Sequence, residues 1–254
     1  MTTPINEQTV LVTGAGRGLG AAIAEAFGRE GAKVAINYRS SRDGAERLAE
    51  RLGSRVKVFQ ADIRDSGQVE RLVAEVTESL GAPTTLIHNA LADFSFNGDA
   101  RSKLDALSWG EVAAHFDTAV KGALNLIRAG RPAMAAAGYG RIVTIGTNLF
   151  QNPVVPYHDY TAAKAALLSL TRTAAAELGP LGITVNMVSG GLLRTTDASA
   201  ATPEAVFDLI AANTPLRRVT TPQEVADAVL FFASPWARAV TGQNLVVDGG
   251  LVFN

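Results

Sequence analysis

Short apolar runs alternate with amphipathic segments along the first third of the chain. The apolar runs lie at 10–12, 34–36, 56–59 and 86–87. Between them, apolar residues recur at helical spacing over 21–30, 42–52 and 66–80. This strict alternation predicts βαβ units with right-handed crossovers, and therefore an α/β fold with a parallel sheet covered by helices on both faces.

The alternation continues through the rest of the chain. A long amphipathic helix is predicted over 107–137, a strand around 142–145, a helix over 160–178 and a strand over 183–188. Segment 192–215 then carries apolar residues at helical spacing. They are Val206, Phe207, Leu209 and Ile210. This pattern fits either a mobile lid over a substrate or ordinary core packing.

Composition narrows the class of protein. The chain has 254 residues, of which 47% are hydrophobic, so we expect one domain over 1–254 with a sizeable core. Lys and Arg number 23 against 24 acidic residues, which favours a small-molecule partner over a nucleic acid or a membrane surface. The absence of cysteine excludes disulfides and thiolate chemistry. A short polar start and the lack of a bilayer-length apolar run predict a soluble, cytoplasmic protein.

A glycine-rich turn follows the first apolar run. The stretch 13–20 reads T-G-A-G-R-G-L-G and leads into a helical segment. Glycine permits close approach of the backbone to a ligand, and the start of a helix attracts anions. The turn therefore predicts a phosphate-bearing cofactor. The alternative is a glycine-rich surface loop without a ligand.

The end of the second strand discriminates between NAD and NADP. An NAD site places a carboxylate there for the ribose hydroxyls, whereas an NADP site uses arginine. This chain reads Asn37, Tyr38, Arg39, Ser40 there and has no carboxylate. Arg39, together with Arg17 of the glycine turn, could pair with a 2′-phosphate, and Ser40 could add a hydroxyl. We therefore predict NADP(H), although Arg39 alone could be an ordinary solvated arginine.

Tyr160 and Lys164 are the candidate catalytic pair. Their spacing of four residues within a predicted helix puts both side chains on one helix face. A lysine cation beside a tyrosine hydroxyl stabilises the phenolate, and together with the cationic nicotinamide of the oxidised cofactor it should lower the pKa of the tyrosine in the complex. The pair could therefore exchange a proton with a carbonyl or alcohol oxygen.

These motifs resemble those of the short-chain dehydrogenase/reductase (SDR) family. The turn T-G-x-x-x-G-x-G, the pair Y-x-x-x-K and the closing stretch 241–250 all fit that family, most closely its 3-oxoacyl-[acyl-carrier-protein] reductase branch. The resemblance implies a single Rossmann-type, doubly wound domain with a seven-stranded parallel sheet. It further implies hydride transfer between NADP(H) and a carbonyl or alcohol substrate, an acyl thioester included, in a homotetramer or homodimer.

The resemblance also assigns site residues. Tyr160, Lys164 and Thr147 take the catalytic positions, and the substrate lid covers about 190–215. The cofactor positions are Gly14, Arg17, Gly18, Leu19, Gly20, Arg39, Ser40, Asp62, Ile63, Asn89, Ala90, Tyr160, Lys164 and Thr195. Asp62 would contact the adenine in this assignment, although it could equally cap a helix or form a turn. No metal site is assigned.

Several positions depart from the family pattern. Thr147 replaces a serine, Ala119 an asparagine of a proton relay, and Leu91 a glycine. Gly190 stands where a proline is usual, and His88 is a further change that we interpret as structural rather than catalytic. The alternative function is therefore an NADP(H)-binding protein with impaired catalysis and a regulatory or assembly role.

The turns before the fifth and sixth strands bear on the substrate. Users of acyl carrier protein place basic residues there, whereas this chain has 138–139 and 180–181 without a basic residue. Arg141 remains nearby. A small ketone, a thioester and a cyclic carbonyl therefore all stay open as substrates.

Overall fold

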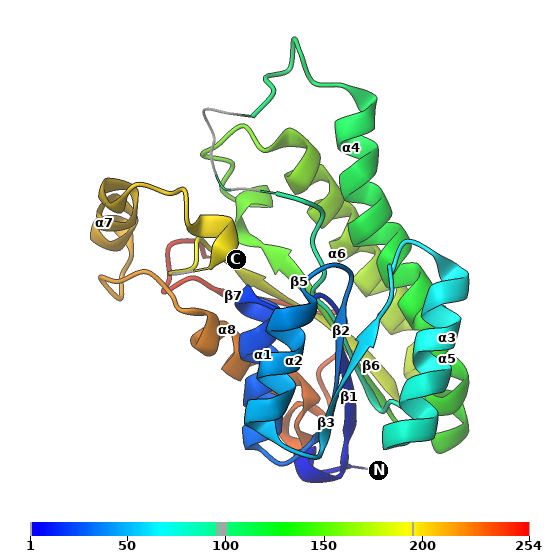
Figure 1. Cartoon of the computed structure of the whole chain (residues 1–254). Coiled ribbons are helices and arrows are strands. Elements are labelled where there is room, and N and C mark those ends of the chain that lie inside the picture. Colours follow the sequence, from blue (N-terminus) through cyan, green and yellow to red (C-terminus); the bar gives the residue numbers. More distant parts are fainter. Residues whose placement is uncertain (1, 95, 97–100, 195, 254) are drawn as a thin grey trace.

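Seven strands form one parallel sheet with helices on both faces (Figure 1). The structure is a computed structural model that describes residues 2–94, 96, 101–194 and 196–253. The strand order is β3-β2-β1-β4-β5-β6-β7, and all six pairings are parallel. The order reverses between β1 and β4, which makes the carboxyl ends of these two strands the switch point of the sheet. The predicted fold class is confirmed.

The elements follow the predicted alternation. The strands are β1 (Thr9–Val12), β2 (Lys33–Tyr38), β3 (Val56–Gln60), β4 (Thr85–His88), β5 (Gly140–Thr147), β6 (Ile183–Gly190) and β7 (Asn244–Val247). The helices are α1 (Gly18–Arg29), α2 (Arg42–Leu52), α3 (Ser66–Leu80), α4 (Trp109–Phe116), α5 (Gly122–Ala137), α6 (His158–Leu178), α7 (Glu204–Asn213) and α8 (Pro222–Ala233). The strands β5 and β6 run further toward their carboxyl ends than their apolar cores indicate, and they bring Thr147 and Gly190 to the same edge.

The alternation of side chains along the central strands separates two large hydrophobic clusters on opposite faces of the sheet. In β1, Val10 and Val12 belong to the cluster under α1, α2 and α8, whereas Leu11 belongs to the cluster under α3, α5 and α6. In β4, Leu86 and Ile87 divide in the same way. Because both faces of the strands are buried, the strands read as continuous apolar runs rather than as alternating ones.

Polar side chains fix where several helices begin. Asp65 accepts a hydrogen bond from the backbone of Gln68 at the start of α3, and Ser108 and Thr221 form capping boxes at the starts of α4 and α8. At the far end of α5, Gly138 adopts φ +61° and turns the chain into β5. These local signals place the ends of the helices without help from distant contacts.

The helix predicted over 107–137 is divided by one π-helical turn. Asp117–Lys121 forms this turn between α4 and α5, and the two helices continue each other across it. A π turn inserts an extra residue and leaves the helical periodicity of the flanking segments intact, so the sequence pattern alone does not indicate it. The turn contains Ala119, one of the positions that depart from the family pattern.

None of the helices in the described ranges is both long enough and apolar enough to span a bilayer.

Replacing Leu86 by alanine tests the importance of the buried sheet. Leu86 is fully buried in β4, and its truncation removes apolar contacts and leaves a cavity, so we expect a loss of about 2–5 kcal/mol in the free energy of unfolding. Urea denaturation followed by circular dichroism measures it. The matched control is Leu104→Ala, because Leu104 is 75% exposed and its truncation should change stability by less than about 0.5 kcal/mol. Equal losses in the two variants would contradict this description of the core.

Candidate functional site

A large cavity lies at the carboxyl edge of the sheet. Its volume is about 650 Å³. The glycine turn and the ends of β2 and β3 line one end of it, and residues of β5 and α6 line the other. The cavity therefore covers the switch point between β1 and β4, where parallel α/β sheets bind their ligands.

The glycine turn is held closely against the loop after β4. Asn89 donates through Nδ2 to the backbone oxygens of Thr13 and Gly14, at 3.0 and 3.2 Å. A Cβ at Gly20 would lie 2.4 Å from that same Nδ2 atom, so a side chain there would break the contact. Gly14 and Gly18 have φ of +63° and +56°, which L-residues with side chains rarely adopt.

The turn leads directly into α1, whose first-turn amides have no acceptor within the helix. Gly16, Gly18 and Leu19 line the cavity at this point. At Gly18, an added Cβ would meet nothing closer than Thr196 at 3.7 Å, so the backbone here borders open space. A cavity wall of backbone amides at the start of a helix fits a pyrophosphate group.

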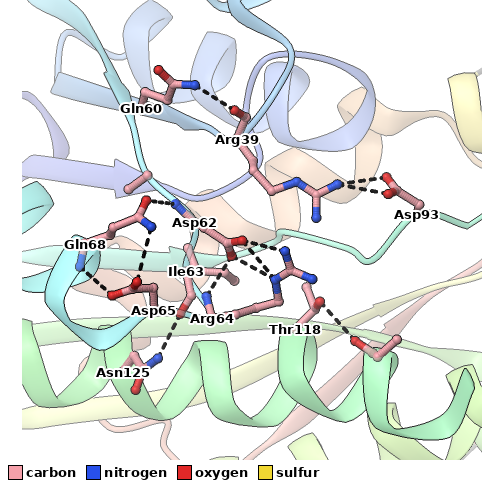
Figure 2. Close-up of polar contacts among 12 residues, drawn as sticks. Arg39, Gln60, Asp62, Ile63, Arg64, Asp65, Gln68, Asp93, Thr118 and Asn125 are labelled. Carbon is pink, nitrogen blue, oxygen red and sulfur yellow. Dashed lines mark hydrogen bonds and ion pairs between the residues drawn. The ribbon is translucent and has the colours of Figure 1, made fainter. Parts of the chain in front are cut away.

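Both arginines predicted to bind phosphate are already paired with carboxylates. Nη2 of Arg39 lies 3.1 and 3.0 Å from the two carboxylate oxygens of Asp93 (Figure 2). Arg17 pairs with Asp197 at 3.4 Å. All four side chains line the cavity, and so does Ser40. The two acids lie in segments that follow β4 and β6 and line the cavity, and these pairings could not be predicted from the sequence.

Asp62 forms a turn rather than a helix cap. Its carboxylate accepts two side-chain hydrogen bonds from Arg64 Nε, at 2.9 and 3.0 Å, and one from the backbone of Arg64 at 3.0 Å (Figure 2). The Arg64 guanidinium holds the pKa of Asp62 below its usual range. The backbone N–H of Asp62 donates to Gln68, and the cap of α3 is Asp65. Asp62 and Ile63 nevertheless line the cavity where the resemblance places an adenine.

Tyr160 and Lys164 lie together in the first turns of α6, and both side chains are buried. Nζ of Lys164 donates to the backbone oxygen of Ile145 at 2.6 Å and lies 5.8 Å from the centre of the Tyr160 ring. Burial lowers the pKa of Lys164 to about 8 and raises the pKa of Tyr160 to about 12, although a hydrogen bond to Thr147 opposes the latter. Desolvation of the phenolate therefore dominates the pKa of Tyr160 in the protein alone, whereas the lowering by Lys164 and the oxidised nicotinamide stays a prediction for the cofactor complex.

An aromatic cluster surrounds Tyr160. Phe94 stacks on its ring with 4.8 Å between centroids and 21° between planes. Phe96 and His115 approach Tyr160 edge-on, and Tyr157 approaches Phe94 in the same way. Phe94, Phe96 and Tyr157 line the cavity, which makes its catalytic end apolar and aromatic. The sequence analysis missed this cluster, because the two phenylalanines come from a loop without periodicity.

A buried charged group lies immediately beside Tyr160. Asp159 is 2% exposed, and its carboxylate accepts a hydrogen bond from the backbone of Tyr160 at 2.8 Å. The same carboxylate pairs with Arg101 and lies 3.5 Å from Nε2 of His115. The Arg101 guanidinium also lies 4.6 Å from the centre of the Phe94 ring. Arg101 thus connects the loop after β4 to the first turn of α6.

The departures from the family pattern have distinct surroundings. His88 is buried, its Nε2 bonds to the backbone oxygen of Ala119 at 2.9 Å, and burial lowers its pKa to about 3. A histidine that stays neutral and bonded to the backbone agrees with a structural interpretation. Leu91 lines the cavity, as does Gly190. Thr195 lies outside the described residues.

The segment predicted as a lid or as core packing lines the cavity with some residues and buries another, and its role as a lid stays a prediction. Val206 and Ile210 of α7 line the cavity, whereas Phe207 is buried and Leu209 is exposed. The segment is tied to the loop after β4, since Phe96 donates its N–H to the backbone oxygen of Ala198 at 2.9 Å. The hydroxyl of Thr202 returns a bond to the backbone oxygen of Phe96 at 3.3 Å.

Comparison with known proteins gives a consistent picture. A family model described as Enoyl-(Acyl carrier protein) reductase matches residues 14–252. The 3-oxoacyl-[acyl-carrier-protein] reductase FabG of Staphylococcus epidermidis is 32% identical over 247 residues, which are 96% of this chain and 98% of that protein. FabG of Escherichia coli K12 is 32% identical over 241 residues, 95% of this chain and 96% of that protein.

A solved structure extends the similarity to three dimensions. A blue fluorescent protein from a metagenomic library, in complex with NADPH, superposes with a TM-score of 0.87 at 31% sequence identity. The match covers 99% of this chain and 100% of that one.

Removing Arg101 tests the buried ion pair beside Tyr160. Arg101→Ala leaves the carboxylate of Asp159 buried without its guanidinium partner, so we expect a loss of about 2–3 kcal/mol in the free energy of unfolding. In an Asp159→Asn background the same change should cost at least about 1 kcal/mol less, because no charge is then left unpaired. Urea denaturation of the four proteins measures this coupling. Additive effects would contradict it.

The pH dependence of stability tests the burial of Lys164. Its pKa falls from 10.5 to about 8 on folding, so the cost of burying its charge is present in full below about pH 8. Between about pH 8 and 10 the unfolded state binds more protons, and wild type should gain stability relative to Lys164→Met. Urea denaturation of both proteins at pH 7 and 9.5 measures the difference. Lys121→Met, at an exposed lysine, is the control, and a pH-independent difference for Lys164→Met would overturn this prediction.

Proposed function

Because the chain belongs to the short-chain dehydrogenase/reductase family, we propose that it is an NADPH-dependent reductase of a small-molecule carbonyl, a 3-oxoacyl thioester or related ketone. One observation carries the proposal. Tyr160 and Lys164 are buried together at one end of a single cavity, and its other end contains Arg39 and the start of α1. The arrangement joins a proton donor to a dinucleotide-sized space.

The donor set fits NADP(H). The amides at the start of α1 suit the pyrophosphate, and Arg39 with Ser40 suits a 2′-phosphate. No carboxylate follows β2 directly, where an NAD site would hold one. When bound, NADPH supplies the hydride for the carbonyl carbon. The NADPH in the complex of the similar blue fluorescent protein supports the same assignment.

Tyr160 is the proton donor in this proposal. A pKa of about 12 keeps its hydroxyl protonated at neutral pH, so the proton is always available to a carbonyl oxygen. An alkoxide that forms on hydride addition is a far stronger base than a phenolate, so transfer of the proton to it is downhill. The oxidative direction would instead need the phenolate, which the cationic nicotinamide of the oxidised cofactor would help to stabilise.

Lys164 and Thr147 complete the catalytic group. Lys164, held on the backbone oxygen of Ile145, places a cation beside Tyr160 where negative charge develops as the proton leaves. The same ammonium would hold the nicotinamide ribose, as the resemblance to the family implies. Thr147 hydrogen-bonds to Tyr160 and lowers its pKa, so its hydroxyl still performs the task expected of the family serine.

The surroundings favour an uncharged substrate. Phe94, Phe96 and Tyr157 line the catalytic end, and α7 adds apolar side chains. Among the described residues that line this end, Lys164 is the cation, and it is held by the backbone oxygen of Ile145. Acyl chains and flat ketones both fit such a wall. The turns before β5 and β6 lack the basic residues that would bind an acyl carrier protein.

The alternative is an NADP(H)-binding protein with impaired catalysis. The alanine at 119 supports it, because the backbone oxygen of Ala119 is taken by His88 and its side chain offers no polar group. The buried Tyr160 and Lys164 oppose it. Turnover decides between the two.

Tyr160→Phe distinguishes the two functions. The purified protein would be tested for oxidation of NADPH and NADH against 3-oxoacyl thioesters, diketones and quinones. We expect wild type to turn over one carbonyl class with NADPH, and Tyr160→Phe to lose at least about 10²-fold in kcat because its proton donor is gone. Cofactor affinity, measured by fluorescence titration, should change by less than about two-fold. Turnover that persists in Tyr160→Phe would overturn the proposed role, and tight binding without any turnover in wild type would favour the alternative.

A further inference from the structure

The carboxylate of Asp93 pairs with Arg39, the cation that the proposed function assigns to the 2′-phosphate of the cofactor. Its two oxygens lie 3.1 and 3.0 Å from Nη2 of Arg39, and both residues line the cavity (Figure 2). The backbone oxygen of Arg39 is in turn held by the side chain of Gln60 at 3.1 Å. Arg39 therefore has a fixed backbone anchor and a carboxylate partner contributed by a different loop.

Two anions cannot share this guanidinium without cost. The 2′-phosphate of NADP(H) carries nearly two negative charges, and a carboxylate in contact with the same nitrogen would repel it. A 2′-hydroxyl has the opposite preference, because it donates a hydrogen bond that a carboxylate accepts. Carboxylates bind the ribose hydroxyls in NAD sites for this reason. Asp93 thus acts in opposite directions on the two cofactors.

We propose that Asp93 is a cofactor-specificity residue, which competes with the 2′-phosphate for Arg39 and so limits the preference for NADPH over NADH. The inference rests on the proposed function for the identity of the cofactor. The inference adds to the proposed function a residue that weakens the preference for NADPH. An NAD site holds a carboxylate directly after β2, and this chain has none there. In this proposal Asp93, from the loop after β4, supplies that carboxylate instead.

The position of Asp93 connects this choice to the catalytic end. The next residue is Phe94, whose ring stacks on Tyr160 at 4.8 Å. Phe94 is also covered by the guanidinium of Arg101, which pairs with Asp159. The ion pair with Arg39 therefore tethers the chain directly next to Phe94. Release of Asp93 would remove this tether and leave Phe94 with its ring contacts and Arg101.

Direct binding of the two cofactors tests the proposal. Asp93→Asn keeps the shape of the side chain and removes its charge. We expect the Kd for NADPH to fall about two- to five-fold, as for loss of an exposed competing ion pair, while the Kd for NADH stays the same or rises. Fluorescence titration at fixed ionic strength measures both without any substrate. Asp105→Asn is the matched control, because Asp105 is exposed and has no ion pair within the described part of the chain.

The same substitution in an Arg39→Ala background identifies the partner. Without the guanidinium, Asp93→Asn should no longer favour NADPH by way of Arg39, so most of the change in the ratio of the two affinities should disappear. If Asp93→Asn with Arg39 present changes the Kd for both cofactors equally, or changes neither, the inference is overturned while the proposed function stands. A wild-type protein that binds neither cofactor would overturn the proposed function and this inference together.

Discussion

Parallel pairing brings all seven carboxyl ends to one edge of the sheet, and the site depends on that constraint. The strands β1 and β4 leave toward opposite sides there, so a cavity opens between the loops that follow them. The lengths of β5 and β6 then set where Thr147 and Gly190 stand along that edge. Helix α6 packs beside β5 and supplies the buried tyrosine and lysine. The sheet therefore sets where the segments that carry the candidate residues meet.

Burial of the catalytic pair has a chemical consequence. In an apolar pocket the neutral forms of both groups are favoured, which raises the pKa of Tyr160 and lowers that of Lys164. A tyrosine that keeps its proton suits the donation step of a reduction. Aromatic rings enclose it, and they exclude water from the point where charge develops. The chain's own residues thus keep the proton on Tyr160 before any cofactor contributes charge.

The fold could be predicted because its signals are local. Apolar runs, glycine ends and capping residues are short-range features, and they placed α2 and α3 correctly to the residue. The common location of Tyr160 and Lys164 could be predicted for the same reason, because residues four positions apart in a helix lie on the same face. The π turn at Asp117–Lys121 was not, because it leaves the periodicity on either side unchanged.

The ion pairs made by the loop after β4 could not be predicted. This loop is irregular, and its path brings Asp93 to Arg39 and Arg101 to Asp159, which lie far apart in the chain. The depth of burial of Tyr160 could not be predicted for a related reason. The neighbouring lysine follows from the sequence spacing, whereas the rings that bury Tyr160 come from other segments and are those of Phe94, Phe96 and His115.

Isotope transfer tests the central claim most directly. NADPH that carries deuterium at the transferable position of C4 would be incubated with the protein and a carbonyl of the class it turns over, and the product examined by mass spectrometry. The proposed reaction predicts one deuterium per product molecule, bonded to the carbinol carbon. Product without deuterium, or no product from any carbonyl class although NADPH binds, would contradict hydride transfer at this site.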